Sequence, residues 1–203
     1  MESALLVDRE LPLAQLLTAH HFVRQSEAVK MESKFFLRDP HGMPYEIVVP
    51  AHIAKTGEER NIPIPQRFQP LFQCLLPEKG LLFLSKDPFR RLDALARALG
   101  IEDQVNGYRR ACVSYEVYAG MKRETAAKYA GHDSTTQKRY LRPVNQCDAK
   151  KYGNFVFDLA KVRQLPRHKK VSFTKLVQKL KEINTTALRL VEPLVSNPEA
   201  AAA

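Results

Sequence analysis

The sequence predicts an α+β fold that is mainly α-helical, with a small antiparallel sheet or hairpin on one side. Apolar residues recur at helical spacing in several segments, whereas the stretch 34–49 reads as short strands separated by turn-forming residues. The chain has 203 residues, of which 44% are hydrophobic, so it can bury a substantial core. We expect one domain over residues 1–165, followed by a basic C-terminal helix and tail over residues 166–203.

The N-terminal part of this domain is expected to contain one helix and two strands. Pro12 suits the first turn of a helix over residues 11–22, and the leucines of this segment can share a buried face. Strands are predicted over residues 34–37 and 45–49, because both segments are rich in apolar residues. The run 39–42 between them, Asp-Pro-His-Gly, is typical of a turn.

The middle of the chain is predicted to add a strand and then become helical. Lys55-Thr56-Gly57 indicates a turn that leads into a strand ending near Pro65. Residues 66–75 are expected to be partly helical, with Pro70 limiting the helix, and residues 81–84 to form a short strand.

Helices are predicted again from Pro88 onwards. Asp87 is a suitable N-cap, Pro88 suits the first helical position and Gly100 follows the end. The apolar face of this helix contains Phe89, Leu92, Leu95, Ala96 and Leu99. A last amphipathic helix is predicted after Ser172, where it could dock onto a second protomer or pack on its own domain.

The stretch 106–140 carries the densest set of candidate functional residues. It contains the adjacent pair Arg109-Arg110, a helix-like segment, Gly131-His132 and finally Tyr140. His132 follows Arg109 by 23 residues and precedes Tyr140 by eight. This order of arginine, histidine and tyrosine resembles the catalytic end of the tyrosine recombinases, the phage-integrase family.

Two earlier segments are similar to further motifs of that family. Arg24-Gln25-Ser26-Glu27 resembles its first arginine motif, in which the acidic residue helps to orient the arginine. The run from Lys55 to Ile64, K-T-G-E-E-R-N-I-P-I, resembles the hairpin that carries the catalytic lysine. Read without the resemblance, these are an ordinary exposed Arg–Glu pair and a surface lysine.

The resemblance implies a metal-independent and ATP-independent DNA recombinase that works through a 3′-phosphotyrosyl intermediate. Arg24 and Arg109 would clamp the phosphate, His132 would donate a hydrogen bond or assist proton transfer, and Lys55 would protonate the leaving 5′ oxygen. Tyr140 would be the nucleophile and Glu27 would support Arg24. The residues expected to contact phosphate or DNA are Asn106, Arg110, Lys138 and Arg139. Asn106 stands where most of the family has histidine, so it can hydrogen-bond a phosphate but cannot act as a base.

Composition fits a nucleic-acid partner. The formal net charge is +10 and the sequence pI is about 9.6, as expected of a phosphate-binding surface. The three cysteines lack metal-type spacing, which suits an intracellular, cytoplasmic protein, and no sequence segment reads as a membrane span or signal peptide. We expect no cofactor and no metal, with double-stranded DNA and further copies of this chain as partners. By analogy these copies form a tetramer on DNA, and the chain alone is expected to be monomeric.

Other functions stay open at this point. A type IB topoisomerase uses the same chemistry but rejoins the original strand. Residues 125–140 can also be read as a helix-turn-helix of a regulatory DNA-binding protein, or the chain as an inactive recombinase. Only 23 residues precede Arg24, where full recombinases carry a helical DNA-clamping domain, so we expect an excised catalytic domain or an unusually small member.

Overall fold

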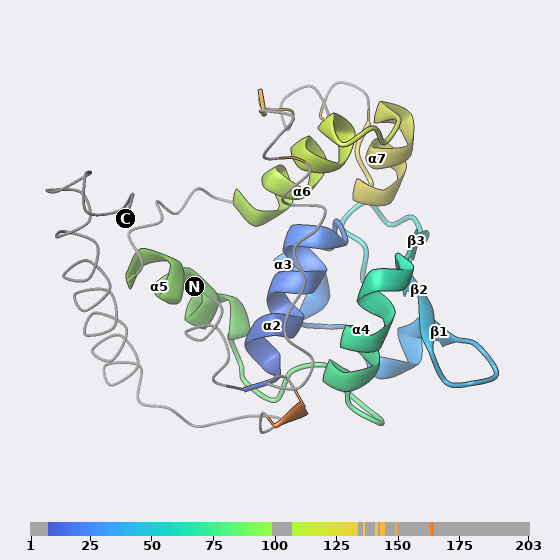
Figure 1. The fold of residues 1–203 in the computed structure, drawn as a ribbon, viewed down its shortest axis with the longest axis vertical. Coiled ribbons are helices and arrows are strands. Elements are labelled where there is room, and N and C mark those ends of the chain that lie inside the picture. Colours follow the sequence, from blue (N-terminus) through green and yellow to red (C-terminus); the bar gives the residue numbers. More distant parts are fainter. Residues whose placement is uncertain are drawn as a thin grey trace, which may run out of the picture.

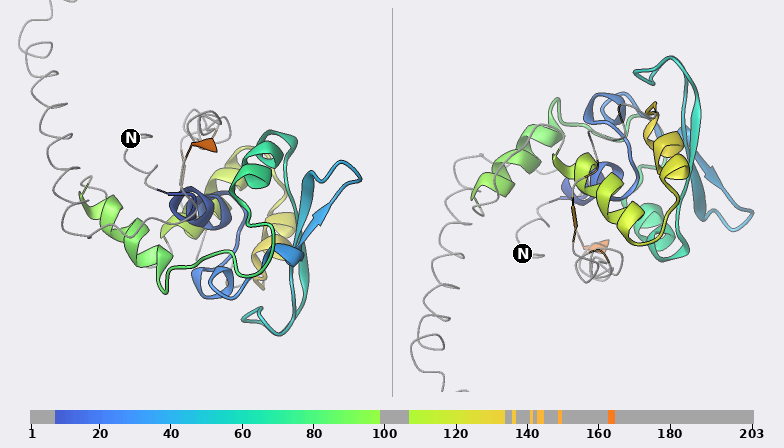
Figure 2. Two further views of the ribbon diagram at one scale, coloured as in Figure 1. Left: turned by 90° about the horizontal axis from the view of Figure 1, so that it is seen from below. Right: turned by 90° about the horizontal axis from the view of Figure 1, so that it is seen from above.

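The computed structural model describes residues 8–98 and 107–133, together with single residues at 136, 141, 143, 144, 149, 163 and 164. Within these residues the fold combines helices with one three-stranded antiparallel sheet, which confirms the predicted α+β class (Figure 1). The sheet lies at one edge, with the helices gathered on one side of it (Figure 2). The expected boundary near residue 165 and the helix after Ser172 lie outside the described residues.

The first helix changes its geometry along its length. α2 (Glu10–Gln15) continues directly into a π-helical turn over Leu16–His20, so the helix predicted to Phe22 ends two residues earlier. His21 then packs its ring against Phe72, with ring centroids 4.7 Å apart. The chain next forms the single helical turn α3 (Gln25–Ala28). The π-helical turn is thus followed closely by the segment that holds Arg24.

Three strands form the sheet in the order β1–β2–β3. They are β1 (Phe36–Arg38), β2 (Pro44–Val49) and β3 (Arg60–Pro63). The Asp39 carboxylate accepts hydrogen bonds from the backbone N–H groups of His41 and Met43, which stabilises the predicted turn. The strand predicted from residue 34 begins later, because Ser33–Phe35 forms a 3₁₀ turn.

After the sheet the chain forms a 3₁₀ turn over Gln66–Phe68 and then α4 (Gln69–Leu75). Pro70 lies in the first turn of α4, where its missing N–H is not needed, so it starts this helix rather than limiting it. α4 packs against β2 and contributes three buried side chains to the core, those of Leu71, Phe72 and Leu75.

The strand predicted over residues 81–84 is wrong. Leu81 forms an isolated antiparallel bridge with Glu32, and no strand is assigned over these residues. The backbone N–H groups of Leu84 and Ser85 instead donate to the Glu10 carboxylate, at 2.5 and 3.2 Å. Because a side chain takes these donors, they are not available for a sheet ladder.

Three helices complete the described fold: α5 (Pro88–Ala98), α6 (Gly107–Tyr118) and α7 (Arg123–Ala130). The Asp87 carboxylate accepts the N–H of Arg90 at 2.9 Å, which confirms Asp87 as the N-cap of α5. α6 packs on the π-helical turn and α7 packs on β3. These two contacts bring the helices that carry Arg109 and Gly131 to the segment after α2.

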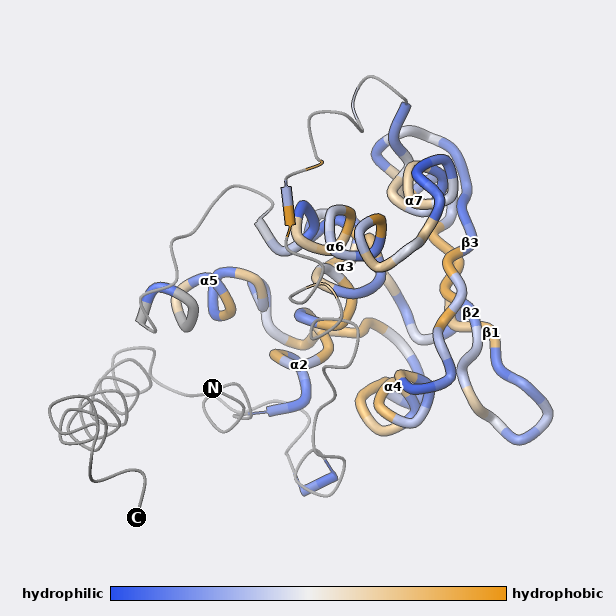
Figure 3. The backbone as a smooth tube through the Cα atoms, turned by 45° about the horizontal axis from the view of Figure 1, so that its top comes forward, coloured by the Kyte–Doolittle hydropathy of each residue, from blue (hydrophilic) through white to orange (hydrophobic). Residues whose placement is uncertain are grey.

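Apolar side chains from nearly every element meet in one core. Figure 3 shows hydrophobic stretches along α4 and along the β2–β3 strands. The largest side chains with under 2% exposure include Phe68, Phe72, Leu11, Leu13, Met31, Ile47, Ile62 and Leu92. Across the described residues no helix combines the length and apolarity that a membrane crossing needs.

Candidate functional site

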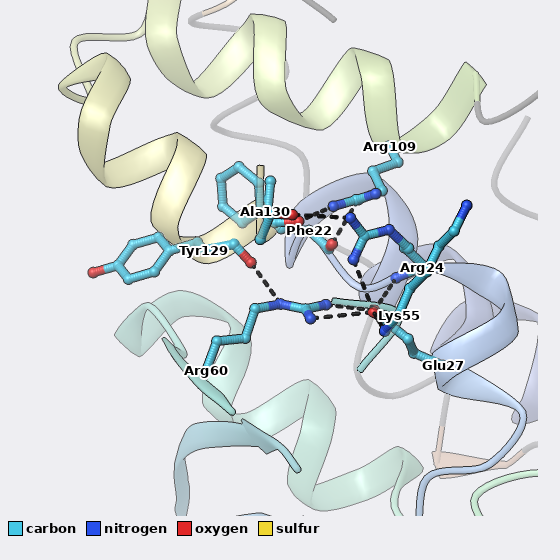
Figure 4. A network of polar contacts seen from close by, with 9 residues as sticks. Phe22, Arg24, Glu27, Lys55, Arg60, Arg109, Tyr129 and Ala130 are labelled. Atoms are coloured by element: carbon cyan, nitrogen blue, oxygen red, sulfur yellow. Dashed lines mark hydrogen bonds and ion pairs between the residues drawn. The ribbon is translucent and has the colours of Figure 1, made fainter. Parts of the chain in front are cut away.

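The Glu27 carboxylate is the centre of a polar network between α3, β3 and α7 (Figure 4). Glu27 is 1% exposed. Its Oε1 accepts hydrogen bonds from Arg24 Nη1 at 2.9 Å, from Arg60 Nη1 at 3.1 Å and from the Lys55 N–H at 3.2 Å. Its Oε2 accepts the Arg24 N–H at 2.9 Å and a second bond from Arg60. One buried carboxylate therefore joins the segment of Arg24 to the segment that runs from Lys55 to Arg60.

These contacts fix the charge of Glu27. Burial alone would raise the pKa of its carboxyl. The hydrogen bonds from Arg60, the charge of Arg60 and the bonds from Arg24 outweigh burial and lower the pKa to about 2. Glu27 is therefore ionised throughout the neutral range, and it holds Arg24 as expected from the sequence.

Arg24 connects this network to the end of α7. Its side chain is 13% exposed, and its Nη2 donates to the carbonyl of Gly131 at 3.0 Å. Gly131 is the C-cap of α7, with φ 56° and ψ 52°, a left-handed conformation that glycine adopts without steric penalty. The N–H of His132 donates back to Ala127 at 2.9 Å, which closes the helix end and leaves the Gly131 carbonyl for Arg24.

Arg109 is buried at the same place from the side of α6. It is 2% exposed, its Nε donates to the Phe22 carbonyl at 2.8 Å, and its Nη2 donates to the Ala130 carbonyl. Phe22 has a φ of 58°, which is uncommon for a bulky residue, and this backbone conformation presents its carbonyl to Arg109. Sequence reasoning did not identify Phe22, because its contribution is a backbone carbonyl.

His132 lies beside three guanidinium groups. Burial, followed by the positive charges of Arg109, Arg24 and Arg60, lowers the pKa of its imidazole to about 3, although Asp133 opposes the shift. His132 is therefore neutral near pH 7. A neutral imidazole can donate one hydrogen bond and accept another, which favours hydrogen bonding to a phosphate oxygen over the supply of a full positive charge.

The side chains of Lys55 and Arg110 are placed differently from those of Arg24 and Arg109. The backbone N–H of Lys55 is anchored on Glu27, while its side chain is exposed and belongs to the turn before β3. Arg110 is partly buried on α6, but successive helix residues point about 100° apart, so it does not share the direction of Arg109. The geometry thus gathers Arg24, Arg109 and His132 at the end of α7, where Glu27 pairs with Arg24 and binds the backbone of Lys55.

Four predicted site residues lie outside the described residues: Asn106, Lys138, Arg139 and Tyr140. Their roles, including that of the nucleophile, stay predictions.

Sequence reasoning assigned no role to Arg60, although in the structure it pairs directly with Glu27. Arg60 is 6% exposed and makes a bidentate ion pair with Glu27. The signal was present in the strand alternation, since Arg60 lies on the same face of its strand as Ile62 and Ile64. A charged residue at a buried position of this pattern needs a buried partner.

A pocket of about 460 Å³ opens beside His132. It is lined by Thr56, Glu58, Glu59, Arg60, Ala127, Lys128, Gly131, His132 and Asp133. Among the residues that the structure describes, no three His, Cys, Asp or Glu side chains form a group that could hold a metal ion.

Comparisons with protein-family models, with curated proteins and with solved structures find no match for this chain.

Proposed function

We propose that this chain cleaves and rejoins double-stranded DNA through a 3′-phosphotyrosyl intermediate, as a tyrosine recombinase does. The observation that carries the proposal is the convergence of Arg24, Arg109 and His132. Arg24 and His132 meet at Gly131, and Arg109 donates to the neighbouring Ala130 carbonyl. Arg24 and Gly131 are 107 residues apart in the sequence, and Arg109 and Ala130 are 21 apart. The two arginines and His132 had been selected from the order of residues in the sequence alone.

The charge of the cluster supports a phosphodiester as its ligand. Arg24 and Arg60 pair with the buried Glu27 carboxylate, and together with Arg109 they place three guanidinium charges near His132. Guanidinium groups stay protonated at all relevant pH values and can grip two oxygens of a phosphate. A phosphate bound beside them would accept charge-assisted hydrogen bonds, which are stronger than bonds between neutral groups.

Each group has a role in the proposed reaction. Arg24 and Arg109 would stabilise the negative charge that develops on the phosphate, and neutral His132 would hydrogen-bond a non-bridging oxygen. The exposed Lys55 side chain would protonate the leaving 5′ oxygen. Tyr140 would attack the phosphorus and release its hydroxyl proton to water. Since a free tyrosine hydroxyl has a pKa of ~10, it needs the arginines for activation.

The linkage formed in this way would conserve the energy of the broken bond. A 5′ hydroxyl from another strand could then reverse the step and exchange strands. The net charge of +10 is consistent with DNA as substrate. Exchange between two sites requires several copies of the chain, so we propose a tetramer assembled on DNA.

The test is covalent trapping on nicked suicide duplexes with a randomised core, followed by sequencing of the trapped DNA. The parent chain is expected to form an adduct that survives denaturation, and Tyr140→Phe to form none. Tyr129→Phe is the matched control, because Tyr129 belongs to α7 and its ring points away from the arginine cluster (Figure 4). An adduct that persists in Tyr140→Phe would contradict the assignment of the nucleophile.

Absence of any adduct on DNA that the parent demonstrably binds would contradict the enzymatic proposal and favour a regulatory DNA-binding protein. Recombined junctions, as opposed to relaxed circles, would separate a recombinase from a type IB topoisomerase.

A further inference from the structure

Arg60 uses all three nitrogens of its guanidinium group in hydrogen bonds within the network. It opens β3, and its side chain is 4% exposed. Nη1 donates to Glu27 Oε1 at 3.1 Å and Nη2 donates to Oε2, so the pair is bidentate. From another edge of the same planar group, Nε donates to the Tyr129 carbonyl at 2.9 Å. One rigid group is therefore held in two directions at once.

These contacts join three elements that are distant in sequence. Glu27 belongs to α3 and also receives the side chain of Arg24. Tyr129 belongs to the last turn of α7, two residues before Gly131. Figure 4 shows the Arg60 side chain spanning from the Tyr129 carbonyl to the Glu27 carboxylate. The strand that carries Arg60 is thereby tied both to α3 and to the end of α7.

Arg60 also lies against the residues that end α7. A methyl group placed on Gly131 would sit 3.5 Å from Arg60 Cδ and Nη1. After burial and the charges of Arg109 and Arg24, the charge of Arg60 further lowers the pKa of His132. Contact geometry and electrostatics thus agree that Arg60 sits directly beside Gly131 and His132.

The planar shape of the side chain matters as much as its charge. Guanidinium presents its donors in fixed directions, whereas a lysine ammonium is a flexible point charge. Lysine at position 60 could still neutralise Glu27. It could not grip both carboxylate oxygens and the Tyr129 carbonyl along the directions that arginine uses.

We propose that Arg60 is a positioning residue: its fork holds the end of α7, and with it Gly131 and His132, in register with Glu27 and Arg24. The inference rests on the proposed function, since His132 is the group presented to the phosphate.

The test compares the parent with Arg60→Lys and Arg60→Met. The rate of single-turnover cleavage of a suicide duplex is measured at saturating DNA concentration. The Kd for the same duplex is measured separately. Arg60→Lys is expected to bind DNA like the parent but to cleave about 100-fold more slowly, as for a group displaced by about 1 Å. Arg91→Lys is the matched control, because Arg91 also pairs with two buried carboxylates, Asp8 and Glu10, away from the site.

NMR supplies a readout that does not need catalysis. The backbone amide signals of Gly131 and His132 are expected to shift in Arg60→Lys and to stay in place in Arg91→Lys. In Arg60→Met, the imidazole of His132 is expected to begin its titration at higher pH than in the parent, because one positive neighbour is gone.

The outcomes separate the two proposals. Parent-like cleavage by Arg60→Lys would overturn the positioning role while leaving the proposed function intact. Equal slowing in Arg91→Lys would also overturn it, by showing that any lost ion pair has this effect. If the parent itself forms no adduct, the proposed function fails. The role of Arg60 is then decided by the amide signals, and unchanged Gly131 and His132 signals in Arg60→Lys would overturn it.

Discussion

At the scale of single residues, the most consequential feature is the placement of one carboxylate among several cationic groups. Glu27 receives five hydrogen bonds from Arg24, Lys55 and Arg60. A buried charge of this kind is stable only while its partners are present. Glu27 therefore couples the stability of the domain to the arrangement of the candidate site.

Glu27→Gln is expected to destabilise the protein by about 3–5 kcal/mol, because it leaves the Arg24 and Arg60 guanidinium groups buried without a counter-charge. The control is Glu32→Gln. Glu32 pairs with Lys34 at 2.8 Å, but the two side chains are 35% and 64% exposed, so its loss is expected to change stability by less than about 1 kcal/mol. Urea denaturation of both variants measures the difference, and equal effects would contradict a central role for Glu27.

At the scale of elements, the end of α7 combines helix termination with the geometry of the site. Gly131 adopts a left-handed conformation that ends the helix, and its carbonyl accepts Arg24. Arg109 donates to the preceding carbonyl, that of Ala130. The unsatisfied carbonyls at a helix C-terminus are thus used by the arginines that are proposed to bind phosphate.

Gly131→Ala and Gly57→Ala form a matched pair for this element. Both glycines have positive φ, 56° and 72°, so each substitution is expected to destabilise by about 1–2 kcal/mol. An added methyl group meets nothing within 4 Å at Gly57, but at Gly131 it lies 3.5 Å from Arg60 and 3.6 Å from Arg24. Only Gly131→Ala is therefore expected to lower the rate of adduct formation.

Thermal denaturation and suicide-duplex cleavage of the two variants check this prediction. A cleavage rate equal to that of the parent in Gly131→Ala would contradict the prediction that a methyl group beside Arg24 and Arg60 disturbs the site.

At the scale of the whole molecule, buried titratable groups are expected to lower the free energy of unfolding as the pH falls. Burial is the main cause that lowers the pKa of His20 to about 3 and of His21 to about 4, and the pKa of His132 is also lowered to about 3. The unfolded chain binds protons on these histidines near pH 6.5, and the folded chain does not. Their contribution is therefore complete above pH 6.5 and is lost as the pH falls toward 3 to 4.

Glu27 acts in the same direction at lower pH. Its pKa is about 2 when folded and 4.5 in the reference state, so its contribution is present above pH 4.5 and is lost as the pH falls toward 2.

The free energy of unfolding is accordingly expected to decrease from pH 7 to pH 5, by about 2 kcal/mol in total for each of the buried histidines His20 and His21. His21→Asn is expected to reduce this slope. The Asn amide can still donate to the Leu16 carbonyl, which His21 Nδ1 approaches at 2.9 Å, but it binds no proton. The same substitution at exposed His41 is the control. Denaturant titrations at several pH values measure the slopes, and an unchanged slope in His21→Asn would contradict the assignment.

Local patterns were sufficient where the structure depends on neighbours in sequence. The Asp39 turn and the N-cap at Asp87 follow from residue types at fixed short spacings, and the structure confirms both. The order of Arg24, Lys55, Arg109 and His132 was also visible in the sequence alone. Tyr140, the expected nucleophile, stays a prediction.

Only the tertiary structure decided which groups lie together at the site and which of them are protonated. Arg60 meets Glu27 across 33 residues, and Arg109 meets the Phe22 carbonyl across 87. The strand expected over residues 81–84 also depends on distant groups, since the Leu84 amide at its end donates to Glu10, 74 residues away. Periodicity and capping report on interactions within one element. Long-range hydrogen bonds, burial and the pKa of His132 depend on how the elements pack, and no short window of sequence contains that information.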